Sequence, residues 1–357
     1  MITFGLYGSG WRSEYFLRVA KFLPDLFKID GVITRNLEKK AHFEKEFKVN
    51  VFTSFEDYSA VCEPDFIVES VNKAVSADIT KKILLAGIPV LMETPAGKDM
   101  DTMIELFEMV KSGHKIQIAE QYPFHPLHQA RKKMIENGLL GEINHVHVSF
   151  SHGYHGVALI RQFLGLNFEN VRIKASSFGV KIAAGVSRTG IPTSDTVSEN
   201  IQTIATLTFE NGQTAVYNFE MNQHRSWVRT PLIQIKGSHG EIFNEQVKYL
   251  KDYETPVELP IKRINLGENQ NVEGFGLKGI LVGDTWMYRN PFQDSRLVDD
   301  EIAVAQCLIN MAHYVKTGEG FYSFAQGCQD MYLGMKIEEA VKNSEEVAIL
   351  TMPWALE

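Results

Sequence analysis

The segment from Gly8 to Ser13 has the residue types and spacing that point most directly to chemistry in this sequence. It reads Gly-Ser-Gly-Trp-Arg-Ser and lies between an apolar run and an amphipathic segment of helical length. A turn this tight needs glycine, and Gly10 lets the backbone approach a pyrophosphate, whose charge the free N–H groups and the helix dipole then meet. We therefore expect a dinucleotide at this turn, with a generic strand-to-helix turn as the alternative.

One position departs from the Gly-x-Gly-x-x-Gly pattern of such turns. Ser13 stands where the third glycine is expected. That glycine serves the close packing of the helix on the strand, so a serine there weakens the match without removing the anion site.

The end of the second expected strand bears on the choice of dinucleotide, because an acidic residue there would bind the ribose 2′-OH of NAD. The segment reads Thr34-Arg35-Asn36, while Asp30 lies at the opposite end of the strand and is a poor candidate. Arg35 is suited to a 2′-phosphate, which favours NADP over NAD. The alternative is an exposed arginine paired with Glu38.

The elements around this turn predict a doubly wound α/β domain. Short apolar runs alternate with amphipathic segments up to about residue 120, as in βα units that build a parallel sheet. Expected strands are 3–6, 31–34, 49–52, 65–69, 90–92 and 116–119, and expected helices are 13–22, 37–47, 77–86 and 100–111.

The pattern changes after Pro123, which indicates a second domain. A helix over 127–137 precedes strands in which apolar and polar residues alternate strictly, such as 214–222. The polar face of the sheet that these strands form is expected either to face solvent or to self-associate. Two helices over 299–317 and 323–343 close the chain, and 251–289 is expected to form long loops with short strands. The predicted domains are 1–121, which binds NAD(P), and 122–357, an α/β domain for substrate and oligomerisation.

Composition excludes several classes of protein. The 357 residues carry a net charge of -8 and lack a basic cluster, which argues against nucleic acid. The longest apolar stretch, 83–92, is far short of the roughly 20 residues of a membrane span. The N-terminus lacks a targeting pattern, so we expect a cytoplasmic protein. Cys62, Cys307 and Cys328 have no disulfide or zinc spacing.

Three segments of the sequence, and their order along the chain, resemble the motifs of the glucose-fructose oxidoreductase and inositol dehydrogenase family (Gfo/Idh/MocA). They are the glycine turn, Glu93-Thr94-Pro95, and the run from Gln121 to Gly141. The resemblance covers most of the chain. It implies a Rossmann domain followed by an α/β domain with a large open mixed sheet, and hydride transfer between nicotinamide and a sugar or polyol.

The resemblance also implies site residues, with departures. Thr94 occupies the position of the family's lysine, and threonine offers no charge to stabilise a developing alkoxide. A family element of Asp, His and Asp maps onto Ser151, His155 and Ala158, so only the histidine remains. The expected cofactor-binding residues are Gly8, Ser9, Gly10, Trp11, Arg12, Thr34, Arg35, Ser70, Asn72, Glu93, Thr94 and Gln121.

His155 is the leading candidate for the general acid or base, because imidazole titrates near neutral pH. Tyr154 is the substitute, and the alternative for His155 is a histidine bonded to the backbone. The histidines at 145, 147, 152 and 155 lack a complete ligand set, so no metal site is expected. Residues 222–229 are suited either to grip a ligand or to line a subunit interface.

These observations predict a cytoplasmic NAD(P)-dependent oxidoreductase of a sugar, polyol or related hydroxyl compound, with a small-molecule substrate and a homo-oligomeric state through the C-terminal sheet. The alternative is a non-catalytic sensor or regulatory protein that binds a dinucleotide and a metabolite, which the loss of lysine at Thr94 and aspartate at Ser151 would permit.

Overall fold

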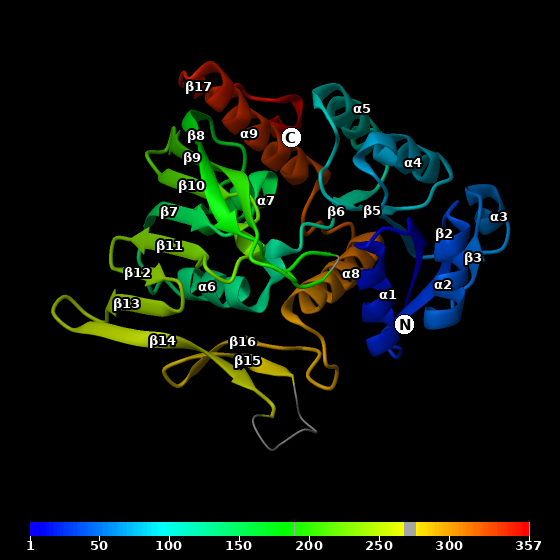
Figure 1. The fold of residues 1–357 in the computed structure, drawn as a ribbon, viewed down its shortest axis with the longest axis horizontal. Helices are drawn as coiled ribbons and strands as arrows, with labels where there is room; N and C mark the ends of the chain where they lie inside the picture. The colour runs from blue at the N-terminus through cyan, green and yellow to red at the C-terminus, as the bar shows by residue number, and fades with distance from the viewer. Residues whose placement is uncertain (189, 268–275, 357) are drawn as a thin grey trace. The chain divides into compact units, whose positions relative to one another are not determined.

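A computed structural model describes residues 1–188, 190–267 and 276–356 of the chain (Figure 1). They form two compact units. The first consists of Met1–Pro126, Ile264–Gly279 and Arg289–Cys328, and the second of Leu127–Arg263, Ile280–Tyr288 and Gln329–Glu357. The predicted domains, 1–121 and 122–357, are each one continuous stretch of chain. Each of the two units instead combines three separate segments.

The first unit contains a six-stranded sheet in the order β3-β2-β1-β4-β5-β6. All of its pairings are parallel, and its central strands are buried because helices cover both faces. The predicted doubly wound Rossmann sheet is confirmed. The strands are β1 Ile2–Tyr7, β2 Phe27–Ile33, β3 Val51–Phe52, β4 Phe66–Glu69, β5 Val90–Met92 and β6 Ile116–Ile118.

Helices begin at polar residues that cap their first turns. The side chains of Asn36, Ser54, Asn72 and Asp99 accept hydrogen bonds from N–H groups two or three residues later. The helices are α1 Ser13–Phe22, α2 Leu37–Phe47, α3 Phe55–Ser59, α4 Lys73–Leu85, α5 Met100–Lys111 and α8 Asp299–Thr317. Helix α3 was not predicted, because its 5 residues are too few to display a helical period.

The second sheet has eleven strands in the order β16-β15-β14-β13-β12-β11-β7-β10-β9-β8-β17. It is mixed, because β7 pairs in parallel with β10 and antiparallel with β11. This confirms the predicted mixed sheet. The strands are β7 Ile143–Ser149, β8 Val171–Ala183, β9 Val197–Phe209, β10 Thr214–Glu220, β11 Leu232–Gly237, β12 Gly240–Phe243, β13 Gln246–Leu250, β14 Pro256–Asn265, β15 Leu277–Val282, β16 Thr285–Arg289 and β17 Val347–Ala348.

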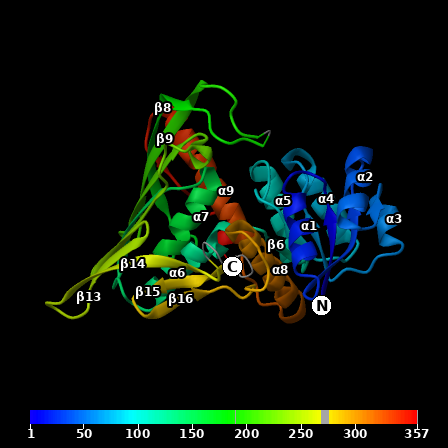
Figure 2. The same ribbon diagram turned by 60° about the horizontal axis from the view of Figure 1, so that its bottom comes forward.

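Helices α7 (Gly153–Leu164) and α9 (Phe324–Asn343) lie along one face of this sheet (Figure 2). Strand β10 turns Ala215, Tyr217 and Phe219 toward them, and these side chains are buried. Val216 and Asn218 point to the other face. The alternation read from the sequence is therefore found over 214–219, but the strand ends at Glu220, which is buried, and Met221 is 52% exposed. The remaining helices are α6 Pro126–Glu136, η1 Tyr122–Phe124, η2 Gln223–Arg225 and η3 Pro353–Ala355.

The prediction for residues 251–289 is wrong in one respect. Strand β14 is 10 residues long, not a short strand between loops. Val257, Leu259 and Ile261 alternate with more exposed residues as in a strand, but Pro256 and Pro260 in the same segment argue against one. Residues 268–275 of this segment lie outside the described residues.

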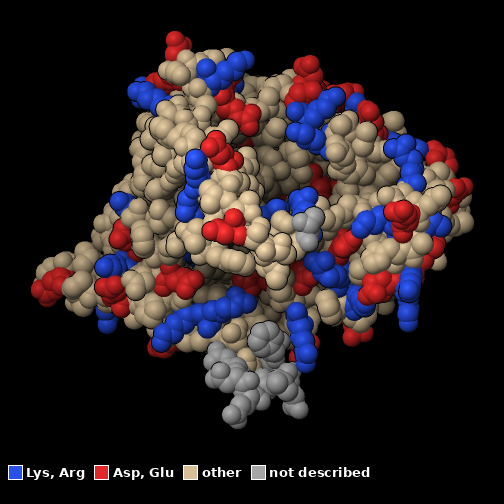
Figure 3. All heavy atoms as spheres, in the orientation of Figure 1, with Lys and Arg blue, Asp and Glu red and all other residues tan. Residues whose placement is uncertain are grey.

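Within the described ranges, none of the helices has both the length and the apolar character that a membrane crossing requires. On the face drawn in Figure 3, basic and acidic side chains are interspersed on the surface.

Candidate functional site

The glycine turn joins β1 to α1, and its two glycines have different reasons to be glycine. Gly8 has φ +136°, and a Cβ there would lie 2.0 Å from the carbonyl oxygen of Ser70. Its N–H donates to the carbonyl of Ile33 at 3.0 Å. Gly10 faces open space, since a Cβ there would meet no described atom within 4 Å. The first glycine therefore serves the fold, and the second leaves room beside the backbone.

Ser13, the departure from the glycine pattern, has a structural use. Its buried Oγ contacts the Oγ of Ser70 at 3.2 Å and donates to the Ser70 carbonyl at 3.4 Å. The first residue of α1 is thus bound to the residue that follows β4. No side chain caps α1. The N–H of Tyr15 donates to the carbonyl of Arg12 at 3.0 Å, and the N–H groups that precede it are placed for an anion.

Arg12 lies in the turn but is directed across the sheet. Its Nε donates to Glu93 Oε1 at 2.7 Å and its Nη1 to Asp300 Oδ2 at 3.0 Å. Glu93 follows β5, two strands from β1, which is a span of about 10 Å at ordinary strand spacing. The guanidinium of Arg12 is therefore found at the β5 side of the sheet, with 12% of its side chain exposed.

Asp300 links this arginine to His125. Its Oδ1 lies 3.1 Å from His125 Nε2, and the His125 ring stacks on Tyr122. Burial by itself would raise the pKa of Asp300, but the hydrogen bond from His125 and the charge of Arg12 lower it to about 2. Neither Asp300 nor His125 was predicted from the sequence. The one available signal was the acidic run 299–301 at the start of a predicted helix.

The end of β2 is connected to the glycine turn by hydroxyl groups. Ser9 Oγ lies 2.7 Å from Thr34 Oγ1, which also accepts from the N–H of Asn36. Arg35 is exposed and makes no hydrogen bond or ion pair with another described residue. Asp30 accepts from the N–H of Glu63 at 2.8 Å, so its carboxylate is used elsewhere.

Two further predicted residues follow β4. Ser70 holds the turn as described above, and Asn72 caps α4 by accepting from the N–H of Ala74. Before them, Glu69 is 1% exposed and accepts from Ser76 Oγ at 2.9 Å and from the N–H of Val71. Burial raises the pKa of Glu69 to about 8, against the lowering effect of these hydrogen bonds, and the charge of Glu93 raises it further.

The last predicted residues of the first unit follow β5 and β6. Glu93 Oε2 accepts from the N–H of Thr94 at 3.2 Å and lies 3.5 Å from the Thr94 hydroxyl. Gln121 is buried, and among the described residues its Oε1 has no hydrogen-bond partner. Trp11 is half exposed and meets Tyr15 edge to face.

Tyr154 and His155 belong to the second unit, at the start of α7. Their rings lie 4.4 Å apart, and His155 is buried. The N–H of Gly153 donates to Tyr217 Oη at 2.7 Å, and burial raises the pKa of Tyr217 to about 12. The structure therefore groups the predicted cofactor residues in the first unit and the predicted proton-transfer residues in the second.

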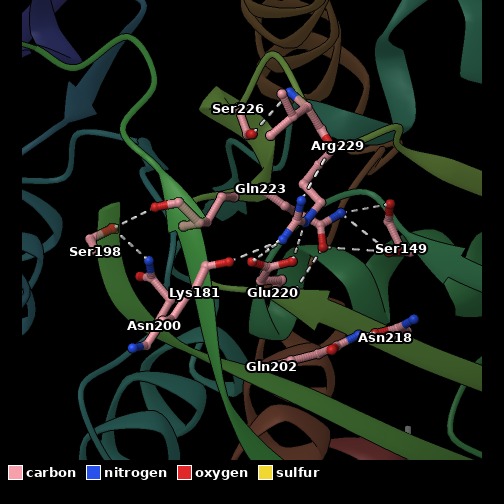
Figure 4. A network of polar contacts seen from close by, with 12 residues as sticks. Ser149, Lys181, Ser198, Asn200, Gln202, Asn218, Glu220, Gln223, Ser226 and Arg229 are labelled. Carbon is pink, nitrogen blue, oxygen red and sulfur yellow. Dashed lines mark hydrogen bonds and ion pairs between the residues drawn. The ribbon is translucent and has the colours of Figure 1, made fainter. Parts of the chain in front are cut away.

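The segment 222–229 is held by an ion pair between a buried glutamate and a partly exposed arginine (Figure 4). Glu220 at the end of β10 binds Arg229 through both carboxylate oxygens, at 2.6 and 3.2 Å. Gln223 is buried, accepts from the N–H of Glu220 and donates to the carbonyl of Ser149. Trp227 remains 71% exposed. These polar groups are used to fix the segment, whose aromatic residue faces outward.

In the part of the chain that the structure describes, no group of three or more His, Cys, Asp or Glu residues is arranged to hold a metal ion. His145 Nδ1 lies 2.9 Å from Thr214 Oγ1. Burial lowers the pKa of His145 and of His147.

Comparison with known proteins gives a family match for the N-terminal part of the first unit. Residues 2–121 match the pattern of the Gfo/Idh/MocA family, an oxidoreductase family with an NAD-binding Rossmann fold. The match is confined to this part of the chain. The resemblance predicted from the sequence is confirmed there. A curated relative, an uncharacterized protein of Saccharomyces cerevisiae, is 24% identical over 160 residues, which cover 43% of this chain and 44% of that protein, so the match spans less than half of its length.

Solved structures share the fold over nearly the whole chain. A levoglucosan dehydrogenase in complex with NADH has a TM-score of 0.71 at 14% identity, covering 98% of this chain and 100% of that chain. A myo-inositol dehydrogenase from Corynebacterium glutamicum has a TM-score of 0.67 at 16% identity, covering 99% and 100%. An NAD-binding oxidoreductase from Klebsiella pneumoniae has a TM-score of 0.69 at 14% identity, covering 98% and 100%. The similarity in fold to these structures therefore extends through the second unit.

We predict that Glu69 makes stability depend on pH. Because its folded pKa of about 8 lies above its ordinary value of 4.5, its stabilising contribution is complete below pH 4.5 and is lost as the pH rises through 8. Urea unfolding at several pH values measures this effect. Between pH 5 and 9 the free energy of unfolding of the parent protein should fall by on the order of 4 kcal/mol more than that of Glu69→Gln. The same pH dependence of the unfolding free energy in both proteins would contradict the ionisation of Glu69 in this range.

Proposed function

We propose that this protein is an NAD(P)-dependent oxidoreductase that transfers a hydride between nicotinamide and a hydroxyl of a sugar, polyol or related compound. The observation that carries the proposal is the glycine turn, in which Gly8 is required by the backbone and Gly10 is open. The names of two neighbours in fold, a levoglucosan and an inositol dehydrogenase, support a polyhydroxylated substrate.

The residues of the turn fit a dinucleotide. An uncapped helix start and an open glycine suit a pyrophosphate, and the hydroxyls of Ser9 and Thr34 lie at the adjoining strand end. When bound, the nicotinamide accepts or gives the hydride. The predicted set Gly8, Ser9, Gly10, Trp11, Arg12, Thr34, Arg35, Ser70, Asn72, Glu93, Thr94 and Gln121 is proposed to surround it.

The proposal includes a preference for NADP over NAD. Arg35 supports it, because this exposed guanidinium has no partner among the described residues and Asp30 is bonded to the backbone of Glu63. An unpaired arginine beside the end of β2 can bind a 2′-phosphate through two parallel hydrogen bonds. An acidic residue that would repel that phosphate is absent from the sequence 34–36.

We expect fluorescence titrations with NADPH and NADH to give tighter binding of NADPH. Arg35→Ala should reduce the ratio of the two affinities by roughly 10- to 100-fold, because it removes a charged contact to the phosphate. Arg172→Ala, an exposed arginine on β8, is the matched control and should leave the ratio unchanged. An unchanged ratio in Arg35→Ala would overturn the preference, and binding of neither nucleotide would overturn the function.

His155 is proposed to handle the proton. Oxidation of a hydroxyl removes a hydride from carbon and a proton from oxygen, and the imidazole of His155 is suited to accept that proton. Tyr154, whose ring lies 4.4 Å from that of His155, is the second candidate. In the reverse direction the same group returns the proton to the carbonyl oxygen.

We predict that His155→Ala lowers kcat/KM by about 100- to 10,000-fold while the affinity for the reduced nucleotide stays unchanged. Tyr154→Phe should have a smaller effect. The assay follows nicotinamide absorbance with a substrate found among neutral sugars and polyols, and His145→Ala provides a histidine control on the open sheet face. Full turnover in His155→Ala would rule out its assignment as the proton acceptor.

A non-catalytic sensor or regulatory protein remains the second candidate function. Thr94 favours it, because its hydroxyl contacts Glu93 and brings no positive charge to the end of β5. The other observation is Ser151, which stands where the family resemblance implies an acid. Such a protein would bind the nucleotide without nicotinamide turnover on any hydroxylated compound.

We further propose a homo-oligomer that forms through the open face of the second sheet. That face carries Val216 and Asn218 of β10, and His147 of β7 lies between Val216 and Gln234 of β11. Light scattering at micromolar concentration should give at least twice the chain mass, and Val216→Arg should reduce it without lowering the melting temperature. A monomeric parent protein would contradict this interface. A cytoplasmic location stays a prediction from the sequence.

A further inference from the structure

Four buried side-chain polar atoms of the first unit have no hydrogen-bond partner among the described residues. Two of them, Nη2 of Arg12 and Oε1 of Gln121, belong to the proposed nucleotide-binding set. The other two nitrogens of the Arg12 guanidinium are bonded to Glu93 and Asp300. Gln121 is 7% exposed. Burial removes water as a partner, so an unpaired donor and an unpaired acceptor both gain if a ligand pairs with them.

Both atoms belong to side chains at the carboxyl ends of β5 and β6. The Arg12 guanidinium is fixed to Glu93, directly after β5. Gln121 follows β6, and the two strands stay paired beyond their ends, since the N–H of Ala119 donates to the carbonyl of Met92 at 2.8 Å. Asp300 connects the two sides, because it binds Arg12 and also His125, on the same short turn as Gln121.

This half of the sheet is where a Rossmann fold receives the second mononucleotide, the nicotinamide half of the cofactor. The nicotinamide ring bears one group with an acceptor and a donor side by side, its carboxamide. We propose that Arg12 and Gln121 recognise this carboxamide, with Arg12 Nη2 donating to its oxygen and Gln121 Oε1 accepting from its NH2. The inference rests on the proposed dinucleotide-binding function.

The charges around Arg12 favour a neutral group over an anion. One guanidinium is bonded to two carboxylates, Glu93 and Asp300, so the cluster is negative by one charge when both are ionised. A pyrophosphate or a substrate carboxylate placed at Nη2 would meet that negative charge. An uncharged amide meets the donor without this repulsion.

Three nucleotides test the two contacts separately by calorimetry. They are NADH, ADP-ribose, which lacks the nicotinamide, and the reduced 3-acetylpyridine analogue of NADH, which keeps the carbonyl but has a methyl group in place of NH2. If Arg35 selects NADPH over NADH, the 2′-phosphorylated forms of these three nucleotides are used instead. Arg12→Gln and Gln121→Met should each weaken NADH binding by about tenfold or more, while the affinity for ADP-ribose stays within about twofold.

The acetylpyridine analogue tests the contact between Gln121 Oε1 and the NH2 group of the carboxamide. The parent protein and Arg12→Gln should prefer NADH over the analogue, and Gln121→Met should lose that preference because the partner of the NH2 is gone. Gln121→Met carries the test on its own if Arg12→Gln, which breaks two ion pairs, fails to fold. Arg18→Gln is the matched control, since it breaks an ion pair between α1 and Glu301 and should leave all three affinities unchanged.

Two results would overturn the inference. One is an equal loss of NADH and ADP-ribose affinity in Arg12→Gln, which would assign Arg12 to the pyrophosphate or to the turn itself. The other is an undiminished preference for NADH over the analogue in Gln121→Met. If the parent protein does not bind ADP-ribose, the proposed function fails and the inference with it, and this outcome is distinct from both.

Discussion

The ion pairs of Arg12 are the interaction on which the first unit depends most. One guanidinium joins the glycine turn to Glu93 after β5 and to Asp300 at the start of α8, at 2.7 and 3.0 Å. Three segments that are far apart in sequence thereby meet at the carboxyl edge of one parallel sheet. Because Arg12 is largely buried, the loss of either carboxylate would leave its charge poorly compensated, which is costly inside a protein. The direction of the Arg12 side chain therefore depends on a residue near the end of the chain.

Local patterns explain what could be predicted from the sequence. The glycine turn, four of the first unit's helices with their bounds, and the alternation in β10 depend on residues that are close together in the chain. The direction of Asp30 away from the cofactor edge also follows from its place in β2. The family resemblance added the mixed sheet of the second unit, which periodicity alone would not have supplied.

The rest depends on contacts between distant residues. Arg12 was expected among the cofactor-binding residues, and its side chain pairs with Asp300, 288 residues away, a contact for which no local pattern exists. Strand β14 escaped prediction because two prolines stand within its alternating segment. Ser13 shows the opposite case, since a departure from the glycine pattern proves to be a hydrogen-bonded link to Ser70.

The most direct test of the central claim is a crystal structure of the protein with bound reduced nucleotide. The account predicts electron density for the pyrophosphate beside the backbone of Gly10 and the first turn of α1, with the nicotinamide on the Glu93 side of the sheet. Density for the nucleotide at any other edge, or an unchanged turn without density at saturating nucleotide, would contradict the assignment of this turn as the dinucleotide site.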